Sequence, residues 1–277
     1  MCQLCLSKTS AWTRRGFILA AGAAASAPVL AQVDVGGPSR ARSLVPAQEL
    51  EVAAAQQYTQ LLEQARAKGA LAGESHPQLQ RLRHIAQRLI PQAGRWNPRA
   101  GQWRWEVNLI GSNSINAFCM PGGKIAFFSG LLTKLQLTDD ETAMVMGHEM
   151  AHALREHARA RIAKTQITGT VASIAAQVLG LGQIGDLAAN IGTQLLSLKY
   201  SRDDENEADL VGLELAARAG YNPDASITLW DKMARASGGG GGPAFISSHP
   251  TGPDRMRNLQ MNIPRVRGLY EQAIAHR

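Results

Sequence analysis

Cysteine is scarce in this sequence. Three of the 277 residues are cysteine, and two of them, Cys2 and Cys5, form a C-x-x-C pair close to the N-terminus. A zinc ribbon needs a second such pair, and the sequence does not contain one. Cys119 stands alone in the rest of the chain, which excludes an intramolecular disulfide there. We therefore expect packing or a bound metal ion, and not disulfides, to stabilise the fold.

The sequence also lacks a large excess of charge of one sign. The formal net charge is +7, and residues 1–31 contribute basic side chains but no acidic one. A balance this mild gives no reason to expect nucleic acid as a partner. With 45% hydrophobic and 18% charged residues, the chain can bury one sizeable core.

The sequence also lacks a strongly hydrophobic run of membrane-spanning length. One stretch, residues 165–185, carries no charge and is long enough to cross a membrane. The stretch nevertheless contains Gln166, Gln177 and Gln183, together with several Thr and Gly residues. This composition favours a buried or lid-like amphipathic helix over a spanning one. We expect at most peripheral contact with a membrane.

Residues 11–31 have the pattern of an export signal. A basic front with Arg14 and Arg15 precedes an Ala/Gly-rich middle and a small-residue ending that suits cleavage after Ala31. The front resembles a twin-arginine signal, and a plain secretory signal that happens to hold two arginines is the alternative. We predict a periplasmic or otherwise exported protein. The expected organisation is an export signal at 1–31, a linker at 32–46 and a single domain at 47–277.

The predicted domain is α+β and predominantly helical. Apolar residues recur at helical spacing along most of it. Two of the helices begin with a capping box, in which Thr138 pairs with Glu141 and Ser201 pairs with Asp204. The helices are expected at 47–68, 76–91, 139–162, 201–219 and 224–236.

A small sheet of about three strands is expected between the second and third of these helices. Trp103, Trp105, Val107 and Leu109 alternate with polar residues, which indicates a half-buried strand that begins at 103. Pro121-Gly122-Gly123 predicts a turn. The turn would join strands near 116–119 and 124–129.

The sequence HEMAH at residues 148–152 falls in the middle of the helix predicted at 139–162. Side chains four residues apart lie one turn above each other, so His148 and His152 project from one face at a separation that one metal ion can bridge. Glu149 is placed beside them to hold a water molecule without displacing it, which is the mechanical content of H-E-x-x-H. The pattern indicates a zinc hydrolase, and two exposed histidines on an ordinary helix are the alternative.

A catalytic zinc ion needs a third protein ligand. Glu205 and Asp209 lie on one face of the helix predicted at 201–219, so Glu205 can ligate while Asp209 accepts the N–H of a ligand histidine. An acidic helix start that only complements the helix dipole is an alternative. The other acidic residues that compete for the ligand role are Asp203, Asp204 and Glu207.

Several short motifs occur in an order that is typical of one known family. They are Asn116-Ala117-Phe118, Pro121-Gly122-Gly123, HEMAH at 148–152, Glu205-Asn206-Glu207-Ala208-Asp209, and His249-Pro250 with Arg255. In these motifs the chain resembles the HtpX/BepA-type zinc metallopeptidases of metallopeptidase family forty-eight. The resemblance extends over residues 103–260 and is far more specific than the zinc motif alone.

The resemblance implies a compact, thermolysin-like gluzincin (minigluzincin) domain. One Zn2+ per chain would be held by His148, His152 and Glu205. Arg255 would stabilise the tetrahedral oxyanion. His249 would either do the same or occupy the open metal position in a resting state.

The resemblance also implies that the strand after Gly123 is an exposed edge on which an extended peptide pairs. A peptidase needs such a main-chain template. An interior strand is the alternative. The residues expected to bind substrate are Lys124, Ile125, Ala126, Phe127, Asn116 and Ala117.

These observations predict a zinc metalloendopeptidase. Glu149 would act as the general base, and an edge strand that reads the backbone would give loose specificity for extended or unfolded polypeptides. Unfolded or misassembled envelope proteins are the expected substrates by resemblance. The alternative is a zinc-containing, chaperone-like or binding protein whose site is gated and rarely active.

Overall fold

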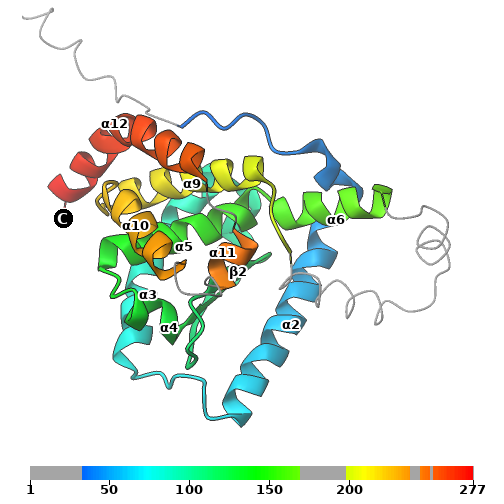
Figure 1. Ribbon diagram of the computed structural model, residues 1–277. Coiled ribbons are helices and arrows are strands. Elements are labelled where there is room, and N and C mark those ends of the chain that lie inside the picture. Colours follow the sequence, from blue (N-terminus) through cyan, green and yellow to red (C-terminus); the bar gives the residue numbers. More distant parts are fainter. Residues whose placement is uncertain (1–32, 169–197, 238–243, 250–251, 277) are drawn as a thin grey trace, which may run out of the picture. The chain divides into compact units, whose positions relative to one another are not determined.

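The computed structural model describes residues 33–168, 198–237, 244–249 and 252–276. Within these ranges the chain is predominantly helical and contains one small mixed sheet (Figure 1), as the sequence predicts. The described residues belong to one compact unit. The helices are α2 (Ala47–Ala67), α3 (Pro77–Leu89), α4 (Ser129–Lys134), α5 (Asp139–Leu154), α6 (His157–Thr168), α9 (Arg202–Arg218), α10 (Ala225–Ser237), α11 (Ala244–Ser248) and α12 (Pro253–Ala275).

The sheet consists of three strands, β1 (Glu106–Ile110), β2 (Ala117–Met120) and β3 (Lys124–Phe128). β1 begins three residues later than the alternation of Trp103 and Trp105 predicts. The 3-10 helix η3 (Pro98–Gln102) runs almost up to it, and the indole N–H of Trp105 bonds back to the carbonyl of Ala100.

The prediction that 124–129 forms an exposed edge is wrong, because β3 is the central strand. The strand order is β1-β3-β2, with β1 parallel to β3 and β2 antiparallel to it. The side chains of Lys124, Ile125, Ala126 and Phe127 are all buried. The unbroken apolar run from Ile125 to Phe127 is typical of a strand covered on both faces, whereas an edge strand would alternate.

The turn between β2 and β3 requires glycine. Gly122 and Gly123 have φ angles of 82° and 77°, in the left-handed region that other residues seldom adopt. A Cβ atom on Gly123 would also lie 2.7 Å from the indole carbons of Trp105. This tight turn places β3 directly beside β2.

The helices α5 and α9 pack closely, with α12 against the other side of α9 (Figure 1). Gly147 and Gly212 face each other at the crossing: a Cβ atom on Gly147 would lie 2.8 Å from the carbonyl oxygen of Gly212. A Cβ atom on Gly212 would lie 2.6 Å from the backbone nitrogen of His148. The two helices therefore approach each other at backbone distance, next to the predicted metal ligands.

Both predicted capping boxes are present. Thr138 and Glu141 exchange hydrogen bonds at the start of α5, and Ser201 and Asp204 do so at the start of α9. These caps fix where each helix begins. The predicted helix 139–162, however, is broken: α5 ends at Leu154 and α6 begins at His157, because Glu156 has a φ of 58°.

The segment predicted as a linker contains the 3-10 helix η1 (Arg40–Leu44). Both ends of this segment contact the helices. At the start of the segment, the backbone N–H of Val33 donates to Glu214 on α9 (2.7 Å). At the other end, Val45 packs with Ile162 of α6. We call residues 33–45 the N-terminal arm.

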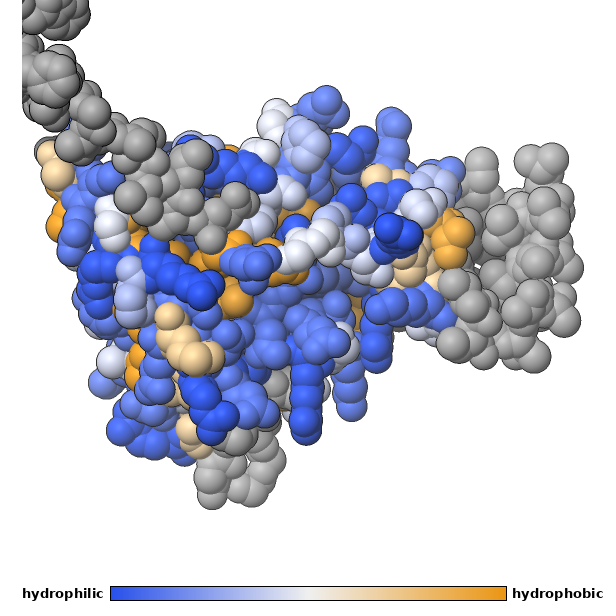
Figure 2. Space-filling view, turned by 90° about the horizontal axis from the view of Figure 1, so that it is seen from above, coloured by the Kyte–Doolittle hydropathy of each residue, from blue (hydrophilic) through white to orange (hydrophobic). Residues whose placement is uncertain are grey.

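The face seen in Figure 2 is mostly hydrophilic, with smaller hydrophobic areas between the polar side chains. None of the described helices combines the length and the apolar character needed to cross a membrane. The amphipathic helix predicted at 165–185 falls on residues outside the described part of the chain, apart from the end of α6.

We predict that Gly212→Ala destabilises the protein. Overpacking against the backbone of α5 costs about 1–3 kcal/mol or more, which outweighs the ~1 kcal/mol that alanine gains over glycine within a helix. Urea unfolding of the metal-free protein measures the difference. The matched control is Gly268→Ala in α12, where a Cβ atom meets nothing within 4 Å, so stability should rise slightly. Equal effects of the two substitutions would contradict the close-packing account.

Candidate metal centre

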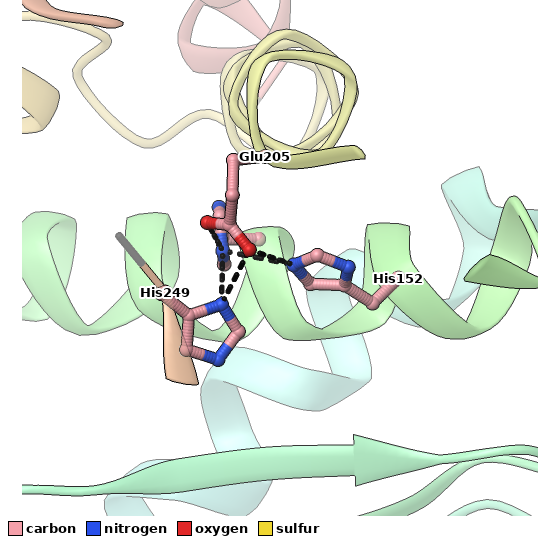
Figure 3. A group of neighbouring side chains, drawn as sticks. His152, Glu205 and His249 are labelled. Atoms are coloured by element: carbon pink, nitrogen blue, oxygen red, sulfur yellow. Dashed lines mark hydrogen bonds and ion pairs between the residues drawn. The ribbon is translucent and has the colours of Figure 1, made fainter. Parts of the chain in front are cut away.

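Four buried side chains converge between α5 and α9. They are His148 and His152 from α5, Glu205 from the first turn of α9, and His249 directly after α11. One ligand atom from each lies within 4.8 Å of the others. Figure 3 shows Glu205 reaching from its helix towards the histidines. The pair predicted from the HEMAH spacing and the Glu predicted from the later helix are thus brought together.

The spacing of these atoms fits a metal ion. His148 Nε2 lies 3.1 Å from His152 Nε2, and each is 3.5 Å from an oxygen of Glu205. A tetrahedral zinc ion with bonds of about 2.0–2.1 Å separates its ligand atoms by about 3.3 Å. Two imidazole nitrogens and a carboxylate are also donors that zinc prefers. The residues present therefore fit the group that the sequence implies.

The competing acidic residues do not point at the converging side chains. Asp204 bonds to Ser201 in the capping box, and Asp203 is exposed. Glu207 pairs with Arg155 and lies 3.4 Å from His157. Among the acids of this helix start, Glu205 alone belongs to the converging group.

His249 lies against the same atoms. Its Nδ1 is 3.0 Å from Glu205 Oε1 and 3.2 Å from His148 Nε2. Its Nε2 is 3.5 Å from Glu149 Oε1. This side chain can therefore supply a fourth ligand, or it can contact a group bound at that position.

Asp209 and Arg255 hold the ligand side chains in place through hydrogen bonds and ion pairs. Asp209 Oδ1 lies 3.0 Å from His148 Nδ1, so a proton on Nδ1 leaves Nε2 free to ligate. Arg255 donates two hydrogen bonds of 2.7 Å to Asp209 and contacts Glu205 at 2.8 Å. The guanidinium also lies over the ring of Trp230. In this arrangement Arg255 holds two carboxylates of α9, and its predicted contact with an oxyanion stays a prediction.

Burial and neighbouring charges set the protonation of the group. Burial raises the pKa of Glu149, which favours a proton acceptor near neutral pH. Burial also raises the pKa of Glu205, but its contacts with His148 and His249 outweigh this effect, so its pKa is well below the ordinary value. Burial lowers the pKa of His152 far below 6.5, which keeps the imidazole neutral, as a metal ligand requires.

Two residues at the site were not predicted. Tyr200 stacks on His152 with ring centroids 3.9 Å apart. His157 Nδ1 lies 2.9 Å from His152 Nδ1. The sequence gives no signal for Tyr200. If the predicted helix continued through 162, the side chain of His157 would point away from His152. The prediction of one unbroken helix therefore gave no reason to place His157 at the site.

A cleft is shared by the converging side chains and the β2 region. Its lining includes Glu149, His249 and Tyr200 together with Asn116, Ala117, Phe118 and Cys119. The strand beside the site is therefore β2 and not β3. Of the residues predicted to bind substrate, Asn116 and Ala117 line the cleft, whereas Lys124, Ile125, Ala126 and Phe127 do not.

We predict that zinc affinity rises with pH beyond neutrality. Burial lowers the pKa of His148, but its bonds to Asp209 and Glu205 outweigh burial and raise the pKa to about 9. A metal ion must displace this proton, so the affinity should rise about tenfold per pH unit up to about pH 9. Competition with a chelator of known pH dependence measures it between pH 6.5 and 8.5. Constant affinity above pH 7, as an ordinary histidine gives, would contradict the prediction.

The chain is similar to several known metallopeptidases. Mitochondrial metalloendopeptidase OMA1 of Schizosaccharomyces pombe is 35% identical over 191 residues, which cover 68% of this chain and 54% of the relative. OMA1 of Saccharomyces cerevisiae is 32% identical over 177 residues, 61% of this chain and 50% of the relative. Metalloprotease LoiP of Escherichia coli is 29% identical over 153 residues, 54% of this chain and 59% of the relative. The chain thus spans 50–59% of the length of these relatives.

These comparisons contradict the predicted periplasmic location, because the two OMA1 relatives are mitochondrial by name. A basic N-terminus without acidic residues is typical of organelle transit peptides as well as of bacterial export signals, so the pattern did not discriminate between them. The relatives also do not single out the HtpX/BepA type.

The comparison with family models agrees with the site geometry. The model described as Peptidase family M48 matches residues 75–263, which include all four converging side chains. The match extends over more than half of the sequence. The chain therefore belongs to peptidase family M48, whose members are metal-dependent peptidases.

Proposed function

We propose that the protein is a zinc-dependent endopeptidase. The observation that carries the proposal is the convergence of His148, His152 and Glu205 at spacings of 3.1–3.5 Å, with the buried carboxylate of Glu149 beside them. Sequence similarity to the metalloendopeptidase OMA1 and to the metalloprotease LoiP supports it. A thermolysin-like gluzincin arrangement, with two histidines on one helix and a glutamate on a later one, is part of the proposal.

Glu149 is the general base of the proposed reaction. Zinc in such a site supplies Lewis acidity, which polarises a carbonyl group and makes water a stronger nucleophile. Glu149 Oε1 has no hydrogen-bond partner among the described residues, and burial raises the pKa of the carboxyl group. It can take a proton from the attacking water and deliver it to the leaving amine. Asp209 and Arg255 keep His148 and Glu205 in place during these steps.

The proposed substrate template is β2. This strand pairs with β3 on one side, and its residues line the cleft that contains Glu149. An extended peptide added along the outer side of β2 would pass the site with its backbone in hydrogen-bonding reach. Because main-chain pairing reads few side chains, we expect cleavage of extended or unfolded polypeptide segments with loose specificity.

A second candidate function is a chaperone-like or binding protein with a gated site. The observation that favours it is the position of His249, whose Nδ1 lies 3.0–3.2 Å from two ligand side chains. A histidine held there would fill the position that water needs. Turnover of an unfolded protein, as opposed to binding alone, separates the two functions.

We predict that Glu149→Gln retains zinc and cuts casein about 10²–10⁴-fold more slowly, because general acid–base catalysis contributes a factor of that size. Glu205→Ala should lose the metal together with activity. The matched control is Glu63→Gln, an isosteric change at an exposed position of α2. Zinc content and casein cleavage are measured on the same samples.

Three results would go against this assignment. Zinc retained by Glu205→Ala would show that Glu205 is not a ligand. Unchanged cleavage by Glu149→Gln would exclude it as the base. Casein that binds to the wild type but is cut only by His249→Ala would establish the gated alternative.

A further inference from the structure

The second ring nitrogen of His152 makes an unusual contact. His152 Nδ1 lies 2.9 Å from His157 Nδ1, and both side chains are buried. His148, in contrast, is backed by the carboxylate of Asp209. The two metal histidines are therefore supported by different groups, a carboxylate and an imidazole.

The contacts continue beyond His157. Its Nε2 atom lies 3.4 Å from Glu207 Oε2, an ion-pair contact that is longer than a well-formed hydrogen bond. The other oxygen of Glu207 accepts from the guanidinium of Arg155. Arg155 also donates to the carbonyl of Gly36 in the N-terminal arm. A chain of polar groups thus runs from the arm to His152.

These polar contacts favour one placement of protons on His152 and His157. A nitrogen that lacks a proton would be repelled by the carboxylate of Glu207, so the proton of a neutral His157 belongs on Nε2. Its Nδ1 is then an acceptor, and it can only accept from a proton on His152 Nδ1. That proton leaves the Nε2 lone pair of His152 directed at the converging group, which is the form that ligates a metal ion.

The break between α5 and α6 brings His157 to this position. Side chains five residues apart in a continuous α-helix point about 140° away from each other around the axis, since each residue turns it by about 100°. The left-handed conformation of Glu156 reverses this by starting a new helix at His157. The carboxylate of Glu156 is held by Arg42 and Arg159. Strained backbone of this kind is concentrated at functional sites.

We propose that His157 is a positioning residue of the metal centre, which selects the tautomer of His152 that presents Nε2 to the metal. Glu207 orients His157, and Arg155 orients Glu207. The proposal rests on the proposed zinc site of His148, His152 and Glu205.

The test is the zinc affinity of His157 variants, measured by chelator competition at one pH on folded protein. His157→Ala and His157→Phe remove the acceptor, and the second of them keeps a ring in the cavity. Both should bind zinc about 10–100-fold more weakly, as is usual when a partner of a ligand histidine is lost. His157→Asn places an amide oxygen close to the position of Nδ1 and should recover most of the affinity. His84→Ala, at an exposed histidine of α3, is the matched control.

The variants distinguish positioning from packing. A histidine that only fills space would be replaced best by phenylalanine, so equal or better zinc binding by His157→Phe than by His157→Asn would overturn the proposal. Wild-type affinity in His157→Ala would overturn it as well. If His157→Ala does not fold, the comparison of Asn with Phe still decides. Glu205→Ala is measured in parallel to test the metal site itself. If Glu205→Ala keeps zinc, the proposed metal site is wrong. If Glu205→Ala loses zinc while the His157 variants bind zinc with unchanged affinity, only the positioning role of His157 is refuted.

Discussion

The close approach of α5 and α9 at Gly147 and Gly212 is the constraint on which the site depends. Because neither residue has a Cβ atom, the two backbones come within van der Waals contact directly beside His148. The carboxylate side chains of α9 can then reach the histidines of α5. Glu205 meets His148 and His152, and one turn later Asp209 meets the other nitrogen of His148. A larger residue at either glycine would separate ligands from partners that must lie about 3 Å apart.

The same packing buries several ionisable groups, which is costly unless they are paired. Arg255 bonds to Asp209 and Glu205, and the ring of Trp230 covers it. A bound cation would compensate the charge that remains on the carboxylates. The buried polar network is thus consistent with a site built to hold a metal ion, in which each ligand is fixed by a second group and not by its own flexibility.

Much of this site could be predicted from residues near each other in the sequence. Helical geometry places His148 with His152 and Glu205 with Asp209, and the capping boxes mark where both helices begin. Features that depend on contacts between distant segments could not be predicted in this way. The central position of β3 is set by β1 pairing on its far side. The left-handed residue Glu156 breaks the helix without a glycine or proline to signal it, and its carboxylate pairs with Arg42 of the distant N-terminal arm. His157 was missed for the same reason.

The central claim is that one zinc ion is held by His148, His152 and Glu205. Anomalous diffraction at the zinc edge from crystals of the zinc-loaded protein tests it most directly. The account predicts one strong peak per chain, within bonding distance of His148 Nε2, His152 Nε2 and an oxygen of Glu205. A peak at other residues, or an ion bound by the two histidines with Glu205 turned away, would contradict it.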